Sequence, residues 1–186
     1  MAQYKIVPLT PLDFKKLQTF CDVQIGPGYF KEVDIVHLFE LGYKDDLQAS
    51  FVAKDQHDLM VAARLTYAPG WTKKKGRGIT PDLWKVPENT VGYFKSLFVD
   101  DKHQKKGLGG KLSRKSIEIL KKQKAQAIVC HSWMQSPGNS SQKYLLSLGF
   151  EPVKDHHLFW HEVDYICTGC KKSKCTCSAQ EMILYL

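Results

Sequence analysis

The sequence predicts one α/β domain in which strands and helices alternate along the chain. Strand-like and helix-like hydrophobic patterns follow one another in the order β-α-α-β-β-β-α-β-α-β-β. A chain of 186 residues can bury one sizeable core, and no linker divides it. The composition, 43% hydrophobic and 25% charged, is ordinary for a soluble globular protein.

The first part of the chain supplies three strands and two helices. Residues 4–9 alternate well enough for a first strand. Thr10 is a suitable N-cap and Pro11 a suitable first residue for a helix that runs to about Cys21. The remaining elements of this part are a helix near residues 33–39 and strands at residues 50–53 and 59–67.

A long loop rich in Pro, Gly and Lys, residues 68–90, leads into the second part of the chain. A short apolar run at residues 127–131 fits a buried parallel strand. The predicted elements here are strands at residues 93–99 and 127–131 and helices at residues 107–123 and 139–148, followed by strand segments at residues 150–153, 158–163 and 182–186.

The most informative segment is the turn between the strand at residues 93–99 and the next helix. It reads Gln-Lys-Lys-Gly-Leu-Gly over residues 104–109. Glycines let the backbone approach a ligand closely, and a helix start presents unpaired N–H groups, so the pattern favours an anion site. The order and spacing fit neither a dinucleotide fold nor a P-loop. The alternative is a glycine turn that merely starts a helix.

Q-x-x-G-x-G at this turn resembles the pyrophosphate loop of the GCN5-related N-acetyltransferases (GNAT family). The sequence Leu148-Gly149-Phe150 after the last helix strengthens the resemblance, which spans residues 4–186. The resemblance implies the GNAT acyl-CoA N-acyltransferase fold, an α+β arrangement with a central mixed, mostly antiparallel sheet flanked by helices. It also implies a single domain over residues 1–186 that transfers the acetyl group of acetyl-CoA to an amine acceptor.

The resemblance also assigns a cofactor site. In this family the pantetheine arm pairs with the strand before the loop, and backbone N–H groups of the loop hold the pyrophosphate. Lys105 and Gln104 replace the first glycine and the arginine of the frequent R-G-x-G-x-G form. The expected cofactor residues are Leu97, Phe98, Val99, Gln104, Lys105, Lys106, Gly107, Leu108, Gly109, Gly110, Lys111 and Asn139.

The implied reaction needs a base for the acceptor amine, an oxyanion donor and an acid for the departing thiolate. We expect the N–H of Val99 as the oxyanion donor, and Glu88 or His131 as the base, with a water chain as the alternative. The family's usual tyrosine position falls on Leu145, one residue from Tyr144, which is about 100° around a helix. Tyr144 is nevertheless the expected acid, and the alternative is an aromatic residue packed on the sheet.

Four cysteines, Cys167, Cys170, Cys175 and Cys177, lie within eleven residues. This pattern predicts a tetrahedral metal site in an insert at about residues 164–179, with structural zinc as the first choice and iron as the alternative. A redox-active or disordered cysteine loop is the competing interpretation. His156, His157 and His161 precede the cluster and could replace a ligand. We expect the insert to shape acceptor binding without taking part in the chemistry.

The net charge of +8 is concentrated in two basic clusters, at residues 102–124 and 73–77. Basic surfaces suit polyanions such as coenzyme A. Two other functions stay open: a non-catalytic acyl-CoA sensor and a nucleic-acid-associated zinc-knuckle protein. No apolar run approaches the ~20 residues of a membrane span, and a cytoplasmic protein is expected. The protein is expected as a monomer, or as a homodimer paired through an exposed final strand. The sequence does not identify the acceptor.

Overall fold

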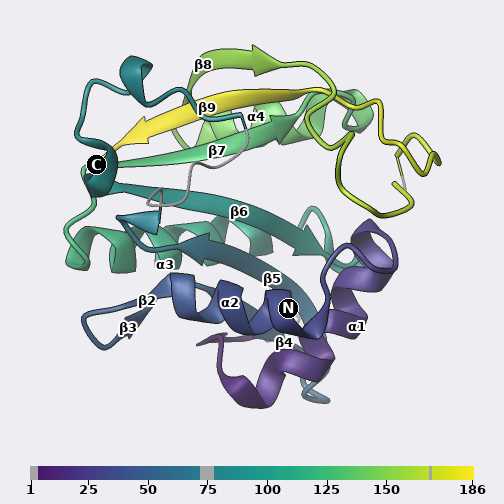
Figure 1. Ribbon diagram of the computed structural model, residues 1–186. Coiled ribbons are helices and arrows are strands. Elements are labelled where there is room, and N and C mark those ends of the chain that lie inside the picture. Colours follow the sequence, from purple (N-terminus) through teal and green to yellow (C-terminus); the bar gives the residue numbers. More distant parts are fainter. Residues whose placement is uncertain (1–3, 72–77, 168) are drawn as a thin grey trace.

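The computed structural model describes residues 4–71, 78–167 and 169–186, and the predicted basic cluster at residues 73–77 lies outside them. A seven-stranded sheet forms the centre, in the order β1-β4-β5-β6-β7-β9-β8 (Figure 1). Its strands are β1 (Lys5–Pro8), β4 (Phe51–Lys54), β5 (Met60–Tyr67), β6 (Val91–Val99), β7 (Ala127–Trp133), β8 (Glu151–His156) and β9 (Ala179–Tyr185). A separate small hairpin is formed by β2 (Tyr43–Lys44) and β3 (Leu47–Gln48).

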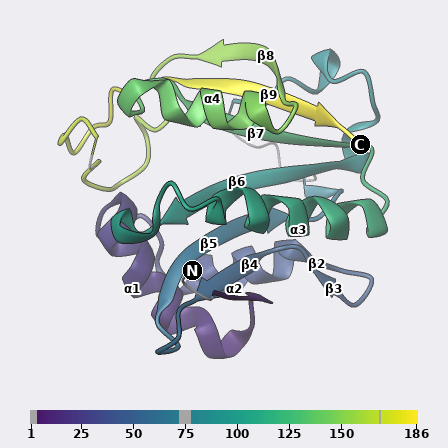
Figure 2. The ribbon, with the colours of Figure 1, turned by 180° about the vertical axis from the view of Figure 1, so that it is seen from behind.

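Helices cover both faces of the sheet. Figures 1 and 2 show α1 and α2 in front of one face and α3 and α4 in front of the other. The helices are α1 (Phe14–Ile25), α2 (Glu32–Gly42), α3 (Leu108–Lys122) and α4 (Ser140–Ser147). Within the described residues, no helix is long and apolar enough to cross a membrane.

The predicted mixed sheet is confirmed. β6 and β7 run parallel, as expected for the buried run at residues 127–131, and the other strand pairs described in this sheet are antiparallel. The buried Leu108, Leu112 and Leu120 of α3 follow a spacing of four and eight residues, which puts them on the helix face turned to the sheet.

Two expectations about the end of the chain were wrong. Residues 158–163 form turns, not a strand, and Leu158 has a φ of 51°, which is incompatible with extended backbone. The final strand, β9, does not lie at an edge of the sheet, because it pairs with both β7 and β8. Its backbone groups are therefore not available for pairing two subunits.

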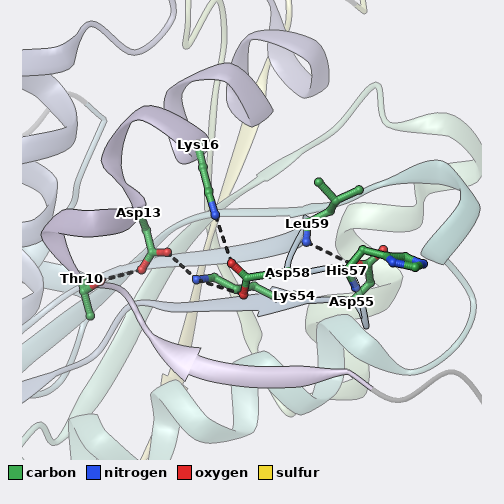
Figure 3. A network of polar contacts seen from close by, with 8 residues as sticks. All are labelled: Thr10, Asp13, Lys16, Lys54, Asp55, His57, Asp58 and Leu59. Carbon is green, nitrogen blue, oxygen red and sulfur yellow. Dashed lines mark hydrogen bonds and ion pairs between the residues drawn. The ribbon is translucent and has the colours of Figure 1, made fainter.

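A polar network ties the start of α1 to the hairpin between β4 and β5 (Figure 3). The buried carboxylate of Asp13 accepts hydrogen bonds from Thr10 Oγ1 at 2.8 Å and from the Thr10 backbone N–H at 3.1 Å. Its other oxygen lies 2.8 Å from Lys54 Nζ. Burial acts to raise the pKa of Asp13, but the hydrogen bonds from Lys54 and Thr10 outweigh it, so the pKa is lowered.

We predict that Asp13→Asn lowers the free energy of unfolding by about 1–3 kcal/mol at pH 7, because it removes the closer, buried carboxylate partner of the Lys54 ammonium. A depressed carboxyl pKa stabilises the fold above the unfolded value of about 3.9, and this contribution is lost as the pH falls through the folded pKa. Denaturant titrations at pH 7 and pH 3 should therefore show the difference from wild type shrinking in acid.

Asp58→Asn is the matched control, because Asp58 belongs to the same network with a 63% exposed side chain. It should change stability less than Asp13→Asn does. Equal losses in the two variants would contradict the role assigned to Asp13.

Candidate active site

The central feature of the candidate site is a split in the sheet between β6 and β7. The parallel ladder joins Val91 to Ala127 and ends where Phe94 faces Cys130. Beyond this point β6 stays paired with β5, and β7 stays paired with β9. The two strands consequently diverge, and one edge of β6 loses its partner.

A bulge in β6 marks the start of the split. Phe94 faces Thr66 on β5 and Ser96 faces Leu65, so that Lys95 is the extra residue between them. A bulge bends its strand and re-aims a side chain. Here it turns the second half of β6 away from β7.

The unpaired edge of β6 presents backbone groups to the gap. The N–H of Asp100 donates to Val61 O on β5 at 2.9 Å. Since successive residues of a strand present their backbone groups to opposite sides, Leu97 and Val99 face the gap, whereas Phe98 faces β5. Of the three residues expected to offer main-chain groups to a ligand, only Leu97 and Val99 therefore do so.

The start of α3 lies beyond the end of this edge. Gly107 caps the helix with a φ of 72°, a conformation that a residue with a side chain adopts only with strain. The first backbone N–H groups of α3, on Leu108, Gly109 and Gly110, have no partner within the helix. A Cβ on Gly109 would lie 3.0 Å from Leu97 Cδ2, so glycine allows the close approach of α3 to β6.

A cleft of about 740 Å³ runs along the split. Most of the predicted cofactor and catalytic residues line it: Leu97, Phe98, Val99, Gln104, Lys105, Gly107, Leu108, Gly109, Gly110, His131 and Tyr144. The glycine turn and the central strand thus come together as expected.

Four predicted residues are not among those that line the cleft. Glu88 is exposed in a turn before β6, at the end of the strand away from the split. Lys106 Nζ donates to Lys102 O within its own turn, and Lys111 is exposed on α3. Asn139 Nδ2 donates to the side chain of Gln142. In each case the residue is close along the chain to residues that line the cleft, but it does not line the cleft itself.

The side chain of Gln104 closes the turn. Its Nε2 donates to Val99 O at 3.1 Å and to Asp101 Oδ1 at 2.8 Å, and its backbone N–H is paired with Asp101 O. Its side-chain and backbone N–H groups are therefore engaged within the turn, and the free N–H groups begin further along the loop.

His131 lines the cleft, but both of its ring nitrogens are engaged. Nε2 lies 2.6 Å from Gly78 O, and since a carbonyl only accepts, this nitrogen carries the proton. Nδ1 then accepts from the Tyr93 hydroxyl at 2.8 Å. Burial lowers the pKa of His131 to about 4, so that the ring is neutral at pH 7. The arrangement is that of a structural histidine.

Next to His131, Glu181 anchors the loop before β6 to the sheet. Its fully buried carboxylate accepts hydrogen bonds from the Thr80 N–H and hydroxyl, the Trp84 indole and His156 Nε2. Burial acts to raise the pKa of Glu181, but these donors outweigh it and the pKa is lowered. Glu181, His131 and His156 also have metal-ligating atoms within 4.8 Å of one another, but each already has protein partners.

Tyr144 reaches the cleft from α4 and meets the first turns of α3. Its hydroxyl lies 3.0 Å from Gly109 O and 2.7 Å from Ser113 Oγ. Ser113 Oγ accepts a hydrogen bond from Arg64 Nε at 3.0 Å. The buried Arg64 guanidinium lies 4.2 Å from the centroid of the Phe94 ring and has no ion-pair partner among the described residues.

Sequence reasoning missed Arg64 and Lys95, two of the cationic residues that line the cleft. Each lies in an apolar strand pattern, where a single charge carries no local signal of its function. None of the described residues that line the cleft is an Asp or a Glu. The charged side chains among these lining residues are therefore all cationic.

The four cysteines converge as predicted. Their sulfur atoms all lie within 4.8 Å of one another, and the six cysteines of the chain are free thiols. Cys170 Sγ and Cys175 Sγ are 3.8 Å apart, and Zn–S bonds of about 2.3 Å in a tetrahedron give an S–S separation of about 3.8 Å. The donor set therefore fits zinc or another ion that accepts four thiolates.

Backbone N–H groups point at two of these sulfurs. The Cys177 N–H donates to Cys175 Sγ at 3.5 Å. N–H groups of Thr176 and Lys172 lower the pKa of Cys170 to about 6, which favours the thiolate that a metal requires. The histidines considered as alternative ligands have other partners: His156 meets Glu181, His157 meets Ser178 and His161 meets Cys175 O.

The cysteine cluster forms one wall of the cleft. Cys167, Cys177 and Gly169 line it, together with Trp133 and Tyr165. A Cβ on Gly169 would clash with the Trp133 ring, so this loop lies directly on the indole. Trp133 is therefore shared between the cysteine cluster and the cleft.

Solved structures with the same fold cover nearly the whole chain. Arabidopsis thaliana NAA60 in complex with acetyl-CoA aligns with a TM-score of 0.74 over 99% of both chains at 14% identity. The ribosomal-protein-S18-alanine N-acetyltransferase from Escherichia coli aligns with a TM-score of 0.66 over 98% of this chain and 94% of that chain at 15% identity. Arabidopsis thaliana Naa50 in complex with the bisubstrate analogue CoA-Ac-MVNAL gives 0.65 over 98% and 99% at 14% identity. At these identities the likeness shows the fold.

No curated protein matches this sequence significantly. The sequence profile of the acetyltransferase (GNAT) family matches residues 20–150, which is more than half of the chain. The match spans the two central strands and the glycine turn that build the cleft. The chain therefore belongs to the acetyltransferase (GNAT) family.

Proposed function

We propose that this protein is an acetyl-CoA-dependent N-acetyltransferase that moves an acetyl group from the thioester to an amine. The observation that carries the proposal is the unpaired edge of β6. The strand is followed by the turn that leads to the glycine-capped start of α3. An extended pantetheine arm can add to such an edge as a further strand, here through Leu97 and Val99. The unpaired N–H groups of Leu108, Gly109 and Gly110 suit the pyrophosphate.

In the proposed transfer, a C–N bond forms at the acetyl carbonyl carbon while the C–S bond breaks. The oxyanion that develops needs a donor aimed from the protein. The N–H of Val99 faces the gap and remains the proposed donor, and the N–H of Leu97, on the same edge and nearer to the split, is equally placed. The acceptor amine has to lose its proton to serve as a nucleophile.

We propose that water takes the proton of the acceptor amine. His131 has no free lone pair, Glu88 lies outside the cleft, and no described residue lining the cleft is a carboxylate. Since neither side chain expected from the sequence can act as the base, we assign this role to water in the open cleft. This choice replaces the two side chains expected from the sequence.

For the leaving thiolate, we propose that Tyr144 acts together with Arg64. The two side chains contact the same Ser113 hydroxyl, and Tyr144 also lies against Gly109 at the helix start. A buried guanidinium stabilises nearby negative charge strongly because little water screens it. Arg64 would favour the thiolate, and the Tyr144 hydroxyl would supply its proton.

A non-catalytic acyl-CoA sensor is the second candidate function. The observation that favours it is the lack of a carboxylate among the described cleft residues, combined with a Tyr144 hydroxyl already hydrogen-bonded to the protein. Release of coenzyme A in the presence of an amine panel separates the two functions, since a sensor binds acetyl-CoA without consuming it.

We further propose that Cys167, Cys170, Cys175 and Cys177 hold a structural zinc ion. All four tetrahedral positions would be filled by protein, which leaves none for a substrate. The net charge of −2 of such a centre would be offset by Lys171, Lys172 and Lys174 in the same loop. The ion would stabilise the wall of the cleft formed by this loop and Trp133.

We predict that Gly107→Glu abolishes acetyl-CoA binding in a calorimetric titration. A carboxylate at this position would occupy and repel the anion site, and the φ of 72° adds backbone strain. Gly28→Glu is the matched control, because Gly28 also has a positive φ (81°) and no atom within 4 Å of a Cβ, but lies between α1 and α2. Undiminished acetyl-CoA binding by Gly107→Glu, or no acetyl-CoA binding by the wild type, would contradict the proposed cofactor site.

We predict that Tyr144→Phe lowers kcat by roughly tenfold, since a proton donor for the thiolate is lost while Arg64 remains. The KM for acetyl-CoA should change little. Tyr185→Phe, in an exposed residue at the end of β9, serves as the control and should retain wild-type turnover. Unchanged turnover of Tyr144→Phe at every pH would remove Tyr144 from the mechanism.

We predict one zinc ion per chain by elemental analysis of protein produced with zinc in the medium. Cys175→Ser, at a buried ligand, should lower the zinc content well below one and reduce the Tm. Cys21→Ser, in a buried cysteine of α1, should keep the metal even if it loses stability. A metal-free wild type with the same Tm before and after chelation would contradict the metal site. Iron in place of zinc would change only the identity of the bound ion.

A further inference from the structure

Lys95 lies on the side of the cleft opposite to the start of α3. Side chains of β6 alternate between the two faces of the sheet: Phe98 packs against α1 and α2, whereas Leu97 and Val99 pack towards α3. The Lys95 ammonium lies 5.7 Å from the centroid of Tyr29, in the connection between α1 and α2. If the cofactor occupies the α3 side of the cleft, Lys95 faces the opposite side, which is left for the acceptor.

The charge of Lys95 has no counterion. No described carboxylate lies within 4.0 Å of its ammonium, which meets the Tyr29 hydroxyl instead. The oxygen of Tyr29 raises the pKa of Lys95 more than burial lowers it, so the side chain stays charged. Tyr67 and Tyr93 lie nearby, and burial raises the pKa of both, so they are neutral.

Two acidic residues near this region, Glu181 and Asp34, are hydrogen-bonded to other groups. Glu181 is fully buried under its hydrogen-bond donors. Asp34, near Tyr67, accepts a hydrogen bond from the Lys31 backbone N–H at the start of α2. An ammonium has three donors, so Lys95 keeps hydrogen-bonding capacity for a ligand.

The surroundings of Lys95 indicate which chemical groups such a ligand contains. A partly buried cation without a partner is costly, and an anionic group that pairs with it offsets that cost. Trp133, Trp160 and Tyr165 supply apolar walls for the rest of the molecule. A polyamine would bring further positive charge into a cleft that already holds Arg64 and Lys95.

Resting on the proposed acetyltransferase function, we infer that the acceptor is a primary amine that also carries an anionic group, a carboxylate or a phosphate, which Lys95 binds. An amino acid is the simplest molecule of this class. Lys95 is then a residue that determines substrate specificity: it holds the anionic end of the acceptor while the amine faces the thioester.

The test compares matched pairs of amines in calorimetric titrations of the coenzyme-A-saturated protein. One member of each pair carries the anion and the other lacks it: phenylalanine with phenethylamine, tryptophan with tryptamine, lysine with cadaverine, and phosphoethanolamine with ethanolamine. For at least one pair the anionic member should bind roughly 10- to 100-fold more tightly, as a charge-assisted hydrogen bond predicts. The pair that shows the preference distinguishes a carboxylate from a phosphate.

Three variants assign the preference to Lys95. Lys95→Met, of similar length and no charge, should lose the preference, and Lys95→Arg should keep most of it. Lys122→Met removes the same charge from the exposed end of α3 and should behave as wild type. Acetyl-CoA affinity and Tm verify that each variant is folded, and Lys95→Gln replaces Lys95→Met if the latter fails to fold.

Equal affinities within every pair, no binding of any anionic amine, or an unchanged preference in Lys95→Met would each overturn the inference. The proposed function is tested separately by acetyl-CoA binding and acetyl transfer. If the protein binds no coenzyme A, the same titrations without it still report the preference due to Lys95. Efficient acetylation of cadaverine or phenethylamine over their anionic partners would keep the acetyltransferase proposal and reject the acceptor class.

Discussion

The loss of pairing between β6 and β7 after Phe94 and Cys130 is the constraint on which the site depends. A strand within a sheet normally has both edges satisfied, and a free edge inside a protein is an opportunity for another extended chain to bind. The bulge at Lys95 makes the separation possible, because it bends β6 while leaving its pairing with β5 intact. The cleft, the backbone N–H groups that Leu97 and Val99 turn to the gap and the orientation of Lys95 all follow from this local change.

The charges along the cleft define the chemistry that the protein can support. Free N–H groups at the start of α3 suit an anion at one end, and Arg64 and Lys95 add positive charge to the lining. The buried carboxylate close by, Glu181, has its oxygens saturated and acts as an anchor for the loop before β6. Such a cleft stabilises developing negative charge well, whereas it offers no described carboxylate to remove a proton.

One wall of the cleft is formed by a segment near the C-terminal end of the sequence. The segment between β8 and β9 carries the four cysteines and packs against Tyr29 and Ile25 near the end of α1. Four converging thiols explain how a segment made largely of turns keeps a defined shape, since a bound ion would replace the missing secondary structure. The cysteine cluster and this wall of the cleft are therefore parts of one surface.

The sequence by itself determined the fold class, the glycine turn with its helix start, the family and the four-cysteine cluster. These features have local or periodic signals: Gly107 needs a positive φ, α3 shows a four-residue apolar spacing, and the cysteines are close together along the chain. The tertiary structure alone decided the direction of side chains and the contacts between distant segments. It turned Glu88 and Asn139 away from the cleft and occupied both nitrogens of His131 with Tyr93 and Gly78. It also brought Arg64 and Lys95 into the cleft without a counterion, because the absence of a carboxylate is a property of the surroundings and has no pattern along the chain.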